Sequence, residues 1–569
     1  MKETLDGIAA LASPIIVMVL GMVVLLMDLG ARPNSAQRQR ILVLSIVGLV
    51  GAFIAAAGAG LSIVTVQTSE RPPALYFGGG MVGDRLGALF SMVLCVIAAL
   101  SILMSDRYLD EKGINQGEFY ALILFATAGS MMMAHAYDLV NIFVGLEILS
   151  VALYILAGFA RRELRSEEAA AKYFLLGAFA SGFLMFGTAL VYGATGIAVQ
   201  TSGTILEPNS SLTNFYTIAQ VLRQSAEQGV PLASSPIFVA GIALLIVGLG
   251  FKAAIVPFHS YAPDVYEGSP TSVTAFMSAG AKAGAFAAFL RVYQMLLPVE
   301  GANGPYRSIL WGLALATMVV GNVLAVRQTN IKRMLAYSSI AHAGYLLLGI
   351  LATGALTLEG NFRDEARLLA QDSVIYYLFV YTFMNLGAFA VVIWLSRNGR
   401  EYLNIQDYAG LAKEQPGAAA VMAVFMLSLA GIPPAAGFFG KLYLFLGAVN
   451  AGYTVLAVLG LLASVVGVYY YLNIIVTMYF RQPAHDFSQV EGGGAKWAAV
   501  LCAVATLVFG LVRVPQITPS FGGSVRPAPR AAVPPPGSEA PPPPGGGASR
   551  PGMSSAGELP PPPGSGPAP

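Results

Sequence analysis

The sequence predicts an all-α, polytopic membrane protein with about fourteen transmembrane helices. Of its 569 residues, 56% are hydrophobic and only 11% are charged, whereas soluble domains are about one quarter charged. Apolar runs of about 20 to 25 residues recur along the chain, which is the length that a helix needs to cross the hydrocarbon core of a bilayer. The net charge of +2 is small and the basic residues are dispersed, which excludes a nucleic-acid-binding surface. The lipid bilayer is therefore the predicted environment of the chain.

The apolar runs place the helices in order along the chain. The first run is long enough to span and no small-residue cleavage site clearly follows it, so it is interpreted as a helix rather than a signal peptide. The predicted spans are residues 8–29, 41–65, 84–105, 117–136, 138–160, 170–194, 236–258, 270–296, 306–327, 331–353, 373–396, 416–446, 452–479 and 495–514.

Two stretches are predicted to lie outside the membrane. Residues 195–235 are rich in Ser, Thr, Asn and Gln, and some of their apolar residues follow helical spacing, which predicts a short surface helix. Those apolar residues are Phe215, Ile218, Val221 and Leu222. Residues 527–569 contain sixteen prolines with Gly and Ser between them, a composition that predicts a disordered or polyproline-like tail.

The charges on the connections predict the orientation. Lys and Arg are about twice as numerous on one set of alternate connections as on the other, with Lys332 counted in the richer set and Arg291 in the poorer one. Because positively charged loops stay in the cytoplasm, both termini are predicted to lie outside.

Five charged residues inside predicted spans are the main functional signal. They are Glu147, Lys172, Lys252, Lys282 and Lys441. Each charge near the bilayer centre costs about 2.5 to 3.5 kcal/mol, so such residues usually face the protein interior or a wet cavity. A buried lysine, unlike an arginine, can exchange its proton near neutral pH. The set therefore predicts a proton path, although static ion pairs between helices are an alternative, and Lys172 could extend its amine to the inner face.

Two of the four histidines are candidate relay residues. His342 lies eleven residues into its predicted span, where a group that titrates near neutral pH suits a relay. His259 follows Pro257 at the end of a span, where a capping or hydrogen-bonding role is an equal alternative. His135 and His485 lie near loop ends and are interpreted as ordinary surface or interface residues.

Proline and glycine interrupt two of the spans beside a lysine. Pro257 follows Lys252 in GLGFKAAIVPFH, and a Pro-Pro pair precedes Lys441 in SLAGIPPAAGFFGKLYLF. These are the seventh and twelfth spans, and their odd offset of five means that they cross the membrane in opposite directions. The same offset pairs Glu147 with His342. The pattern predicts an inverted repeat of five-helix units with two broken helices.

This repeat suggests a division of the chain. The predicted parts are a three-helix region at 1–116, a first half at 117–298, an inverted second half at 299–480, a C-terminal helix at 481–518 and a Pro/Gly-rich tail at 519–569.

At these motifs the sequence resembles a known family, the antiporter-like membrane subunits of respiratory complex I, the NADH-quinone oxidoreductase. The most specific stretches are FVGLEILSVALYIL, FKAAIVPFHSYAPDVYEGSPT, NIKRMLAYSSIAHAGYLLLG and LAGIPPAAGFFGKLYLF. The resemblance covers the predicted spans up to about residue 514 and excludes the tail. Lysine at 441 distinguishes the chain from subunit M and from the related antiporter protein, both of which carry glutamate there. The lack of a lateral helix after the last span distinguishes it from subunit L.

The resemblance implies roles for individual residues. It implies an ion pair between Glu147 and Lys252 that Lys172 modulates, with Lys282 as the central proton carrier and Lys441 as the connection to the outer half-channel. Breaking such a pair removes about 4 kcal/mol at 4 Å and an effective dielectric of 20. Moving one proton against about 150 mV costs around 3.5 kcal/mol. One switch of this kind therefore has the right size to drive one transfer.

No redox centre is predicted on this chain. Cys95 and Cys502 stand alone in apolar runs, and GGGMVG at residues 78–83 is interpreted as a turn rather than a nucleotide-binding loop. By the resemblance, FMN, iron-sulfur clusters and quinone belong to other subunits, the partners are the other membrane subunits of complex I including neighbouring antiporter-like ones, and the location is the bacterial inner membrane. Alternatives are a subunit of a cation/proton antiporter or membrane-bound hydrogenase, and a purely structural membrane scaffold.

Overall fold

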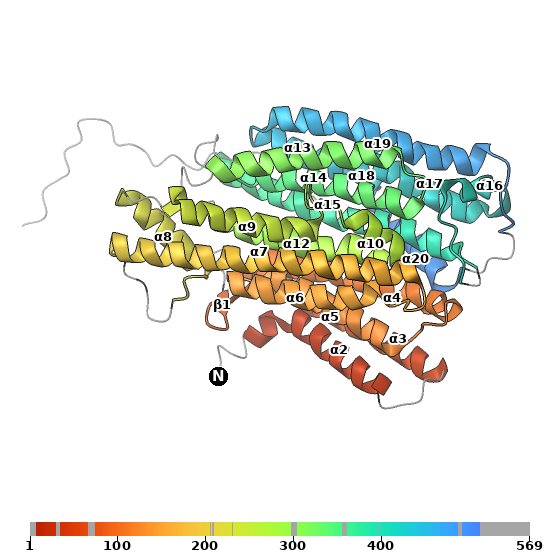
Figure 1. Ribbon diagram of the computed structural model, residues 1–569, viewed down its shortest axis with the longest axis horizontal. Helices are drawn as coiled ribbons and strands as arrows, with labels where there is room; N and C mark the ends of the chain where they lie inside the picture. The colour runs from red at the N-terminus through yellow and green to blue at the C-terminus, as the bar shows by residue number, and fades with distance from the viewer. Residues whose placement is uncertain are drawn as a thin grey trace, which may run out of the picture. The chain divides into compact units, whose positions relative to one another are not determined.

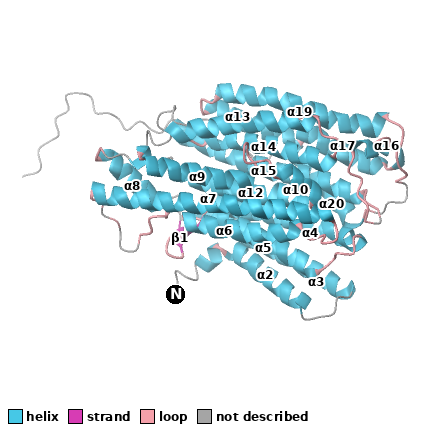
Figure 2. Ribbon diagram, viewed as in Figure 1, coloured by secondary structure: helices cyan, strands magenta, loops and turns pink. Residues whose placement is uncertain are grey.

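The computed structural model describes residues 7–29, 35–66, 74–204, 206, 210–229, 232–296, 304–354, 361–397, 399–487 and 492–512. Within this part of the chain the long helices run side by side and nearly parallel (Figure 1). Helix makes up almost all of the regular structure there (Figure 2). The predicted tail at 519–569 lies outside the described residues.

The helices and strands have the following bounds, in chain order. They are α2 (Ala12–Leu29), α3 (Ser35–Val66), β1 (Ala74–Tyr76), β2 (Met81–Gly83), α4 (Arg85–Glu111), α5 (Gly117–His135), α6 (Leu139–Ala157), α7 (Leu164–Ser202), α8 (Phe215–Glu227), η1 (Leu232–Ser234), α9 (Pro236–Ala253), α10 (Ala262–Gly268), α11 (Thr271–Phe276), η2 (Met277–Ala281), α12 (Lys282–Leu296), α13 (Gly304–Val326), α14 (Ile331–Ala352), α15 (Asn361–Trp394), η3 (Ile405–Tyr408), α16 (Leu411–Glu414), α17 (Pro416–Ala430), α18 (Ala436–Asn450), α19 (Thr454–Phe480) and α20 (Gly493–Leu511).

Thirteen helical segments of the described chain are long and apolar enough to cross a membrane. They correspond to all the predicted spans except 416–446, so the predicted count of about fourteen is reduced by one. That stretch folds as two helices of 15 residues each, α17 and α18. The chain breaks between them because Gly431 adopts a left-handed conformation (φ 85°) and two prolines follow at positions 433 and 434.

The all-α prediction missed one small hairpin. Strands β1 and β2 pair antiparallel, with Tyr76 opposite Met81. The turn between them uses Gly78 and Gly79 at positive φ (68° and 82°), which glycine adopts without steric cost. The prediction of a turn at 78–83 is thus correct for the glycines, whereas Met81–Gly83 forms a strand.

The predicted surface helix within 195–235 is confirmed as α8. Its four apolar residues Phe215, Ile218, Val221 and Leu222 are all buried. The preceding helix α7 is longer than predicted, because it continues to Ser202.

Burial divides the helices into a central and an outer group. The most apolar windows of the α11–α12, α14 and α15 segments are 100%, 94% and 89% buried, whereas those of α2, α3 and α7 are 33%, 28% and 39% buried. Outer helices therefore present apolar side chains to the lipid, as expected in a bilayer. The central helices carry Lys282 and His342, so these polar groups lie in the protein interior.

Small residues let some helices approach closely. A Cβ atom at Gly187 in α7 would lie 2.8 Å from the carbonyl oxygen of Gly241 in α9. Such contacts hold helices together in a membrane, where burial of apolar surface gives little driving force. This packing brings the end of α9, with Lys252, against α7.

Candidate functional site

Lys252 lies at the end of α9, directly before the first break. The helix ends where Ala254 adopts a left-handed conformation, and α10 begins only at Ala262. The Lys252 side chain is buried, and its Nζ donates hydrogen bonds to Ser150 Oγ (2.9 Å) and Tyr173 OH (3.1 Å). The ammonium is therefore held by neutral oxygens from α6 and α7.

The ion pair implied between Glu147 and Lys252 is not formed in this structure. Glu147 Oε1 is buried without a hydrogen-bond partner, although the carboxylate is close enough to act electrostatically on Lys252. Ser150 lies one helical turn beyond Glu147 on the same face of α6 and takes the hydrogen bond instead. The unpartnered oxygen leaves the carboxylate available for water or for a closer approach of the ammonium.

Lys172 is placed at the periphery rather than beside this pair. Its side chain is 41% exposed, and its Nζ forms ion pairs with Glu168 (2.6 Å) and Asp264 (3.0 Å). Asp264 also accepts from Arg333, so Lys172 belongs to a charged network that links α7, α10 and α14. This is the alternative in which its amine extends away from the buried groups.

Lys282 is the most central of the predicted residues. It follows a five-residue π-helical turn, Met277–Ala281, a distortion that often marks functional positions in helices. Its side chain is buried and its ammonium donates a hydrogen bond to the backbone carbonyl of Ser339 in α14. No ion pair to Lys252, Lys282 or Lys441 occurs within 4.0 Å among the described residues.

His342 joins three helices through two tyrosines. Its Nδ1 lies 2.5 Å from the hydroxyl of Tyr377 in α15, and its Nε2 lies 3.1 Å from the hydroxyl of Tyr471 in α19. Both ring nitrogens are thus engaged, and Tyr377 also stacks on the ring. A histidine bonded at both nitrogens can take a proton on one side and release one on the other.

Lys441 lies in α18, just beyond the second break. Its Nζ donates to the carbonyl oxygens of Leu429 (2.9 Å) and Ala430 (3.1 Å), and to Ser464 Oγ (3.0 Å). The two carbonyls belong to the last turn of α17 and have no partner within that helix, so they are a favourable site for a cation. Lys252 and Lys441 are therefore each placed next to a break.

His259 lies between α9 and α10. It is half-buried, and its Nδ1 is buried without a hydrogen-bond partner. The structure does not bring it into contact with any of the buried lysines, and its unpartnered nitrogen is compatible with contact to water.

Two cations that the sequence assigned to loops are in fact buried. Lys332 begins α14 and Arg291 lies in α12, and both side chains are almost completely buried. Hydropathy alone sets the ends of a span and does not reveal that α14 begins packed against α10. The set of buried cations is thus Lys252, Lys282, Arg291, Lys332 and Lys441, with Lys172 outside it.

Arg291 forms a bidentate pair with Asp84 near the start of α4. Its Nη1 and Nη2 each lie 2.6 Å from a carboxylate oxygen of Asp84. Burial would raise the pKa of Asp84, but the charge and hydrogen bonds of Arg291 outweigh burial and hold that pKa below its usual value. This pair joins α12 to the outer of the two predicted membrane faces.

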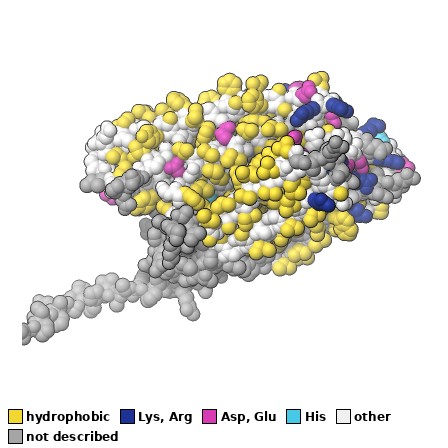
Figure 3. Space-filling model, turned by 90° about the horizontal axis from the view of Figure 1, so that it is seen from below, with side chains coloured by type: hydrophobic (Ala, Val, Ile, Leu, Met, Phe, Trp, Pro, Cys, Tyr) yellow, Lys and Arg dark blue, Asp and Glu magenta, His cyan; other side chains and the backbone are white. Residues whose placement is uncertain are grey.

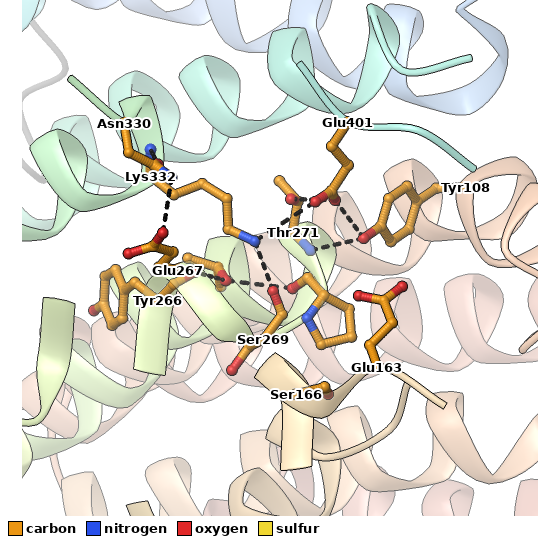
Figure 4. Close-up of polar contacts among 12 residues, drawn as sticks. Tyr108, Glu163, Ser166, Tyr266, Glu267, Ser269, Thr271, Asn330, Lys332 and Glu401 are labelled. Atoms are coloured by element: carbon orange, nitrogen blue, oxygen red, sulfur yellow. Dashed lines mark hydrogen bonds and ion pairs between the residues drawn. The ribbon is translucent and has the colours of Figure 1, made fainter. Parts of the chain in front are cut away.

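Lys332 belongs to a second buried network, shown in Figure 4. Its Nζ donates to the carbonyl oxygen of Ser269 (2.7 Å) and lies 3.8 Å from Glu401 Oε2. Glu401 Oε1 accepts from Tyr108 OH (2.5 Å) and Thr271 Oγ1 (2.6 Å). Burial would raise the pKa of Glu401, but the charges of Lys332 and Lys112 and these hydrogen bonds lower it to about 2.

The charged surface residues are unevenly distributed. On the face seen in Figure 3, Lys and Arg gather at one end of the molecule, and the sides are mostly hydrophobic. The described residues contain no group of three or more His, Cys, Asp or Glu that could hold a metal ion, and Cys95 and Cys502 are each buried and free.

Comparisons with known proteins agree with this arrangement. The profile of the family described as "NADH:quinone oxidoreductase/Mrp antiporter, TM" matches residues 136–467. A protein named NADH-quinone oxidoreductase subunit N from Trichlorobacter lovleyi is 43% identical over 500 residues, which cover 88% of this chain and 93% of that protein.

Solved structures also match over most of the chain. A chain of respiratory complex I from Thermus thermophilus is 33% identical with a TM-score of 0.67, and the match covers 88% of this chain and 97% of that one. A chain of the Mrp complex from a Dietzia species has a TM-score of 0.69 at 20% identity, covers 88% and 94% of the two chains, and shows likeness of fold alone.

Proposed function

We propose a route for protons through this chain, which belongs to the family of NADH-quinone oxidoreductase subunit N, the antiporter-like membrane subunit of respiratory complex I. The chain is a multi-pass membrane subunit of a proton-translocating NADH-quinone oxidoreductase, and other subunits of that complex are its partners. The sites, the direction and the order of transfer given below are our proposal.

The observation that carries the proposal is the environment of three buried amines. Lys252, Lys282 and Lys441 are each bonded to hydroxyl or carbonyl oxygens, and no carboxylate of the described chain lies within ion-pair distance of them. Neutral oxygens stabilise an ammonium less than a carboxylate does, so both the charged and the neutral form of each amine are accessible. Groups of this kind can accept and release a proton in turn.

In the proposed sequence, each step moves one proton from an ammonium to a neutral amine. Lys252 receives a proton when Glu147 approaches it, and releases that proton to Lys282 when the carboxylate withdraws. From Lys282 the proton passes to Lys441 by way of His342 and its two tyrosines. Water bridges the gaps, because side chains on separate helices need not touch for a proton to pass. Lys172 and His259 lie beside this route and adjust the charge around Lys252.

The two breaks support an inverted arrangement of two halves, 117–298 and 299–480. In each half a helix ends at a left-handed residue, Ala254 in the first and Gly431 in the second, with proline within four residues of that point. Lys252 precedes its break and Lys441 follows the other. An opened backbone holds water and polar contacts at membrane depth, so each half supplies one half-channel. The remaining parts of the proposed division are 1–116, 481–518 and 519–569.

The gathering of Lys and Arg at one end supports the proposed orientation. That end faces the cytoplasm, both termini lie outside, and the membrane is the bacterial inner membrane. Flavin, iron-sulfur and quinone chemistry takes place on other subunits, and this chain converts the energy that they release into proton movement.

The test replaces Lys282 with alanine in the intact complex, reconstituted in vesicles. We expect Lys282→Ala to assemble with the other subunits and to lower proton uptake by about tenfold or more, because a carrier in series is lost. Quinone-linked NADH oxidation and dye-detected proton uptake are measured together, and assembly is checked by the subunits that co-purify. The matched control is Lys413→Ala, which replaces a lysine in the short helix α16 that lies apart from the route.

Two outcomes contradict the proposal. Normal proton uptake by an assembled Lys282→Ala complex excludes Lys282 as a carrier. Loss of assembly in Lys282→Ala, with normal proton uptake in Lys252→Ala and Lys441→Ala, favours the structural scaffold instead.

A further inference from the structure

The network around Lys332 and Glu401 has no part in the route described above. Lys332 is 1% exposed at the first turn of α14 and comes from none of the interrupted helices. Its ammonium lies between two groups, the Ser269 carbonyl in the break between α10 and α11, and the Glu401 carboxylate in the connection that follows α15 (Figure 4). A charge buried so completely is costly to maintain, so its position calls for a functional reason.

Lys332 is held as loosely as the three amines of the proposed route. The 3.8 Å between its Nζ and Glu401 Oε2 is longer than a hydrogen bond, and the shorter contact is to a neutral carbonyl. The other oxygen of Glu401 is occupied by the hydroxyls of Tyr108 and Thr271. Glu401 remains an anion at neutral pH because its pKa is lowered to about 2. It can therefore fix the position of a cation without taking the proton.

The network reaches the surface at the Lys- and Arg-rich end. Tyr108 lines a surface pocket together with Arg107, Glu111, Trp394 and Ser396. The Lys112 ammonium lies 5.5 Å from the centre of the Tyr108 ring and pairs at 2.8 Å with Glu163, which is 51% exposed. A line of polar groups thus runs from half-exposed Glu163 to buried Glu401 and Lys332.

The network also points inward, toward Lys282. Lys332 and Ser339 are seven residues apart on α14, so they share one face at about 10 Å. The carbonyl of Ser339 is the hydrogen-bond acceptor of Lys282. One face of α14 therefore connects the two buried amines.

Buried polar atoms without partners belong to this same region. Among the described residues they include Ser269 Oγ and Ser272 Oγ near Lys332, and Ser339 Oγ, Tyr381 OH and Asn385 Oδ1 near Lys282. Asn385 also donates to Ser278 in the π-helical turn that precedes Lys282. Buried polar groups are nearly always satisfied, and ordered water supplies the missing partner where protein does not. The unpartnered atoms thus outline a path for a file of water molecules.

We propose that Lys332 is a further proton carrier, which takes protons from the inner face and delivers them through water to Lys282, and that Glu401 is its positioning residue. The inference rests on the proposed function, because it supplies the same Lys282. In the first step a hydronium gives its proton to the neutral Lys332 amine and becomes water. In the second the Lys332 ammonium gives a proton to the water file, which delivers one to the neutral amine of Lys282. The charged groups that face Lys332 are Glu401, Lys112, Glu163 and Glu267.

The experiment separates a carrier from a fixed cation. Lys332→Arg keeps the positive charge but does not release a proton, because the guanidinium stays charged at accessible pH. Lys332→Met removes both the charge and the proton. In the vesicle-reconstituted complex we expect both variants to lower proton uptake by about tenfold. Lys413→Arg and Lys413→Met, on the lysine in α16, are the matched controls and leave uptake unchanged.

A third variant tests the positioning role and does not depend on replacing Lys332. Glu401→Gln retains oxygen and nitrogen atoms that can bond Tyr108 and Thr271 but removes the anion. We expect the pH profile of proton uptake to move to lower pH, because the ammonium form of Lys332 loses its stabilising charge. A merely structural role would not move the profile.

The outcomes distinguish this inference from the proposed function. Full uptake by Lys332→Arg means that only the charge matters and overturns the carrier role. If the Lys332 variants fail to assemble, an unshifted profile in Glu401→Gln overturns the inference, and a shifted profile supports it. Normal uptake in the Lys332 variants together with loss in Lys282→Ala refutes the inference alone. Normal uptake in Lys282→Ala refutes the proposed function itself.

Discussion

Lys441 Nζ lies 2.9 Å from the backbone carbonyl oxygen of Leu429, so an amine on α18 binds the C-terminal end of α17. The carbonyls at a helix end carry partial negative charge and have no partner within their own helix. The break in the chain therefore creates the site that holds this lysine. The position of the amine should depend on the backbone of the break as well as on the lysine itself.

Replacing Gly431 with alanine tests this dependence. A Cβ atom there would lie 3.1 Å from Lys441 Cδ and 3.4 Å from Nζ, at a left-handed backbone position with φ 85°. We expect Gly431→Ala to cost about 1 to 2 kcal/mol of stability through backbone strain and to lower proton uptake several-fold by displacing the amine. Thermal unfolding and proton uptake of the reconstituted complex are the two measurements.

The control for this variant is Gly203→Ala. Gly203 is also left-handed, at φ 62°, but a Cβ atom there meets no other atom of the described chain within 4 Å. The strain should be similar and the proton uptake normal. Equal losses of uptake in both variants would show that strain alone, and not the contact with Lys441, is responsible.

The buried pair of Asp84 and Arg291 should be important for stability. Asp84→Asn can still cap α4 by accepting from Gly87 N, but it leaves the guanidinium of Arg291 buried without a countercharge. We expect a loss of about 3 to 5 kcal/mol, measured as a lower unfolding temperature of the purified complex. Asp110→Asn is the matched control, because Asp110 and Arg38 form a pair with side chains 47% and 35% exposed. That pair should contribute less than about 1 kcal/mol, and equal effects of the two substitutions would contradict the assignment.

Glu401 should make stability depend on acidic pH. Its pKa is lowered from 4.5 to about 2 on folding, so the folded state binds this proton less readily than the unfolded state. The resulting stabilisation is complete above pH 4.5 and is lost as the pH falls toward 2. Its size is about 3 kcal/mol from the pKa difference.

The measurement compares unfolding temperatures of the unaltered complex and the Glu401→Gln variant over this range. The variant is expected to be the less stable of the two at neutral pH, and the two curves should converge as the pH falls below 4.5. Parallel curves would show that Glu401 titrates at its ordinary pKa in the folded protein.

Composition and spacing were enough to predict the membrane class and thirteen of the spanning helices. The reason is that a bilayer imposes one length and one polarity on every span, so each apolar run reports its own structure. The two breaks were also predictable, since Pro257 and the Pro-Pro pair before Lys441 act on the backbone within a few residues. Lys252, Lys282 and Lys441 stood out because few charges occur within long apolar runs.

Partners across the fold were not predictable in the same way. The sequence alone could not show that Ser150 takes the hydrogen bond of Lys252, that Lys172 turns to Asp264, or that Lys332 is buried against Ser269 and Glu401. Each of these depends on which helices pack together, and residues such as Lys332 and Glu401 are 69 positions apart (401 − 332 = 69). Hydropathy is a local property, whereas the burial of a charge is decided by neighbours from distant helices. The sequence by itself determined which groups can carry a proton, and only the tertiary structure decided which of them are buried and what each one contacts.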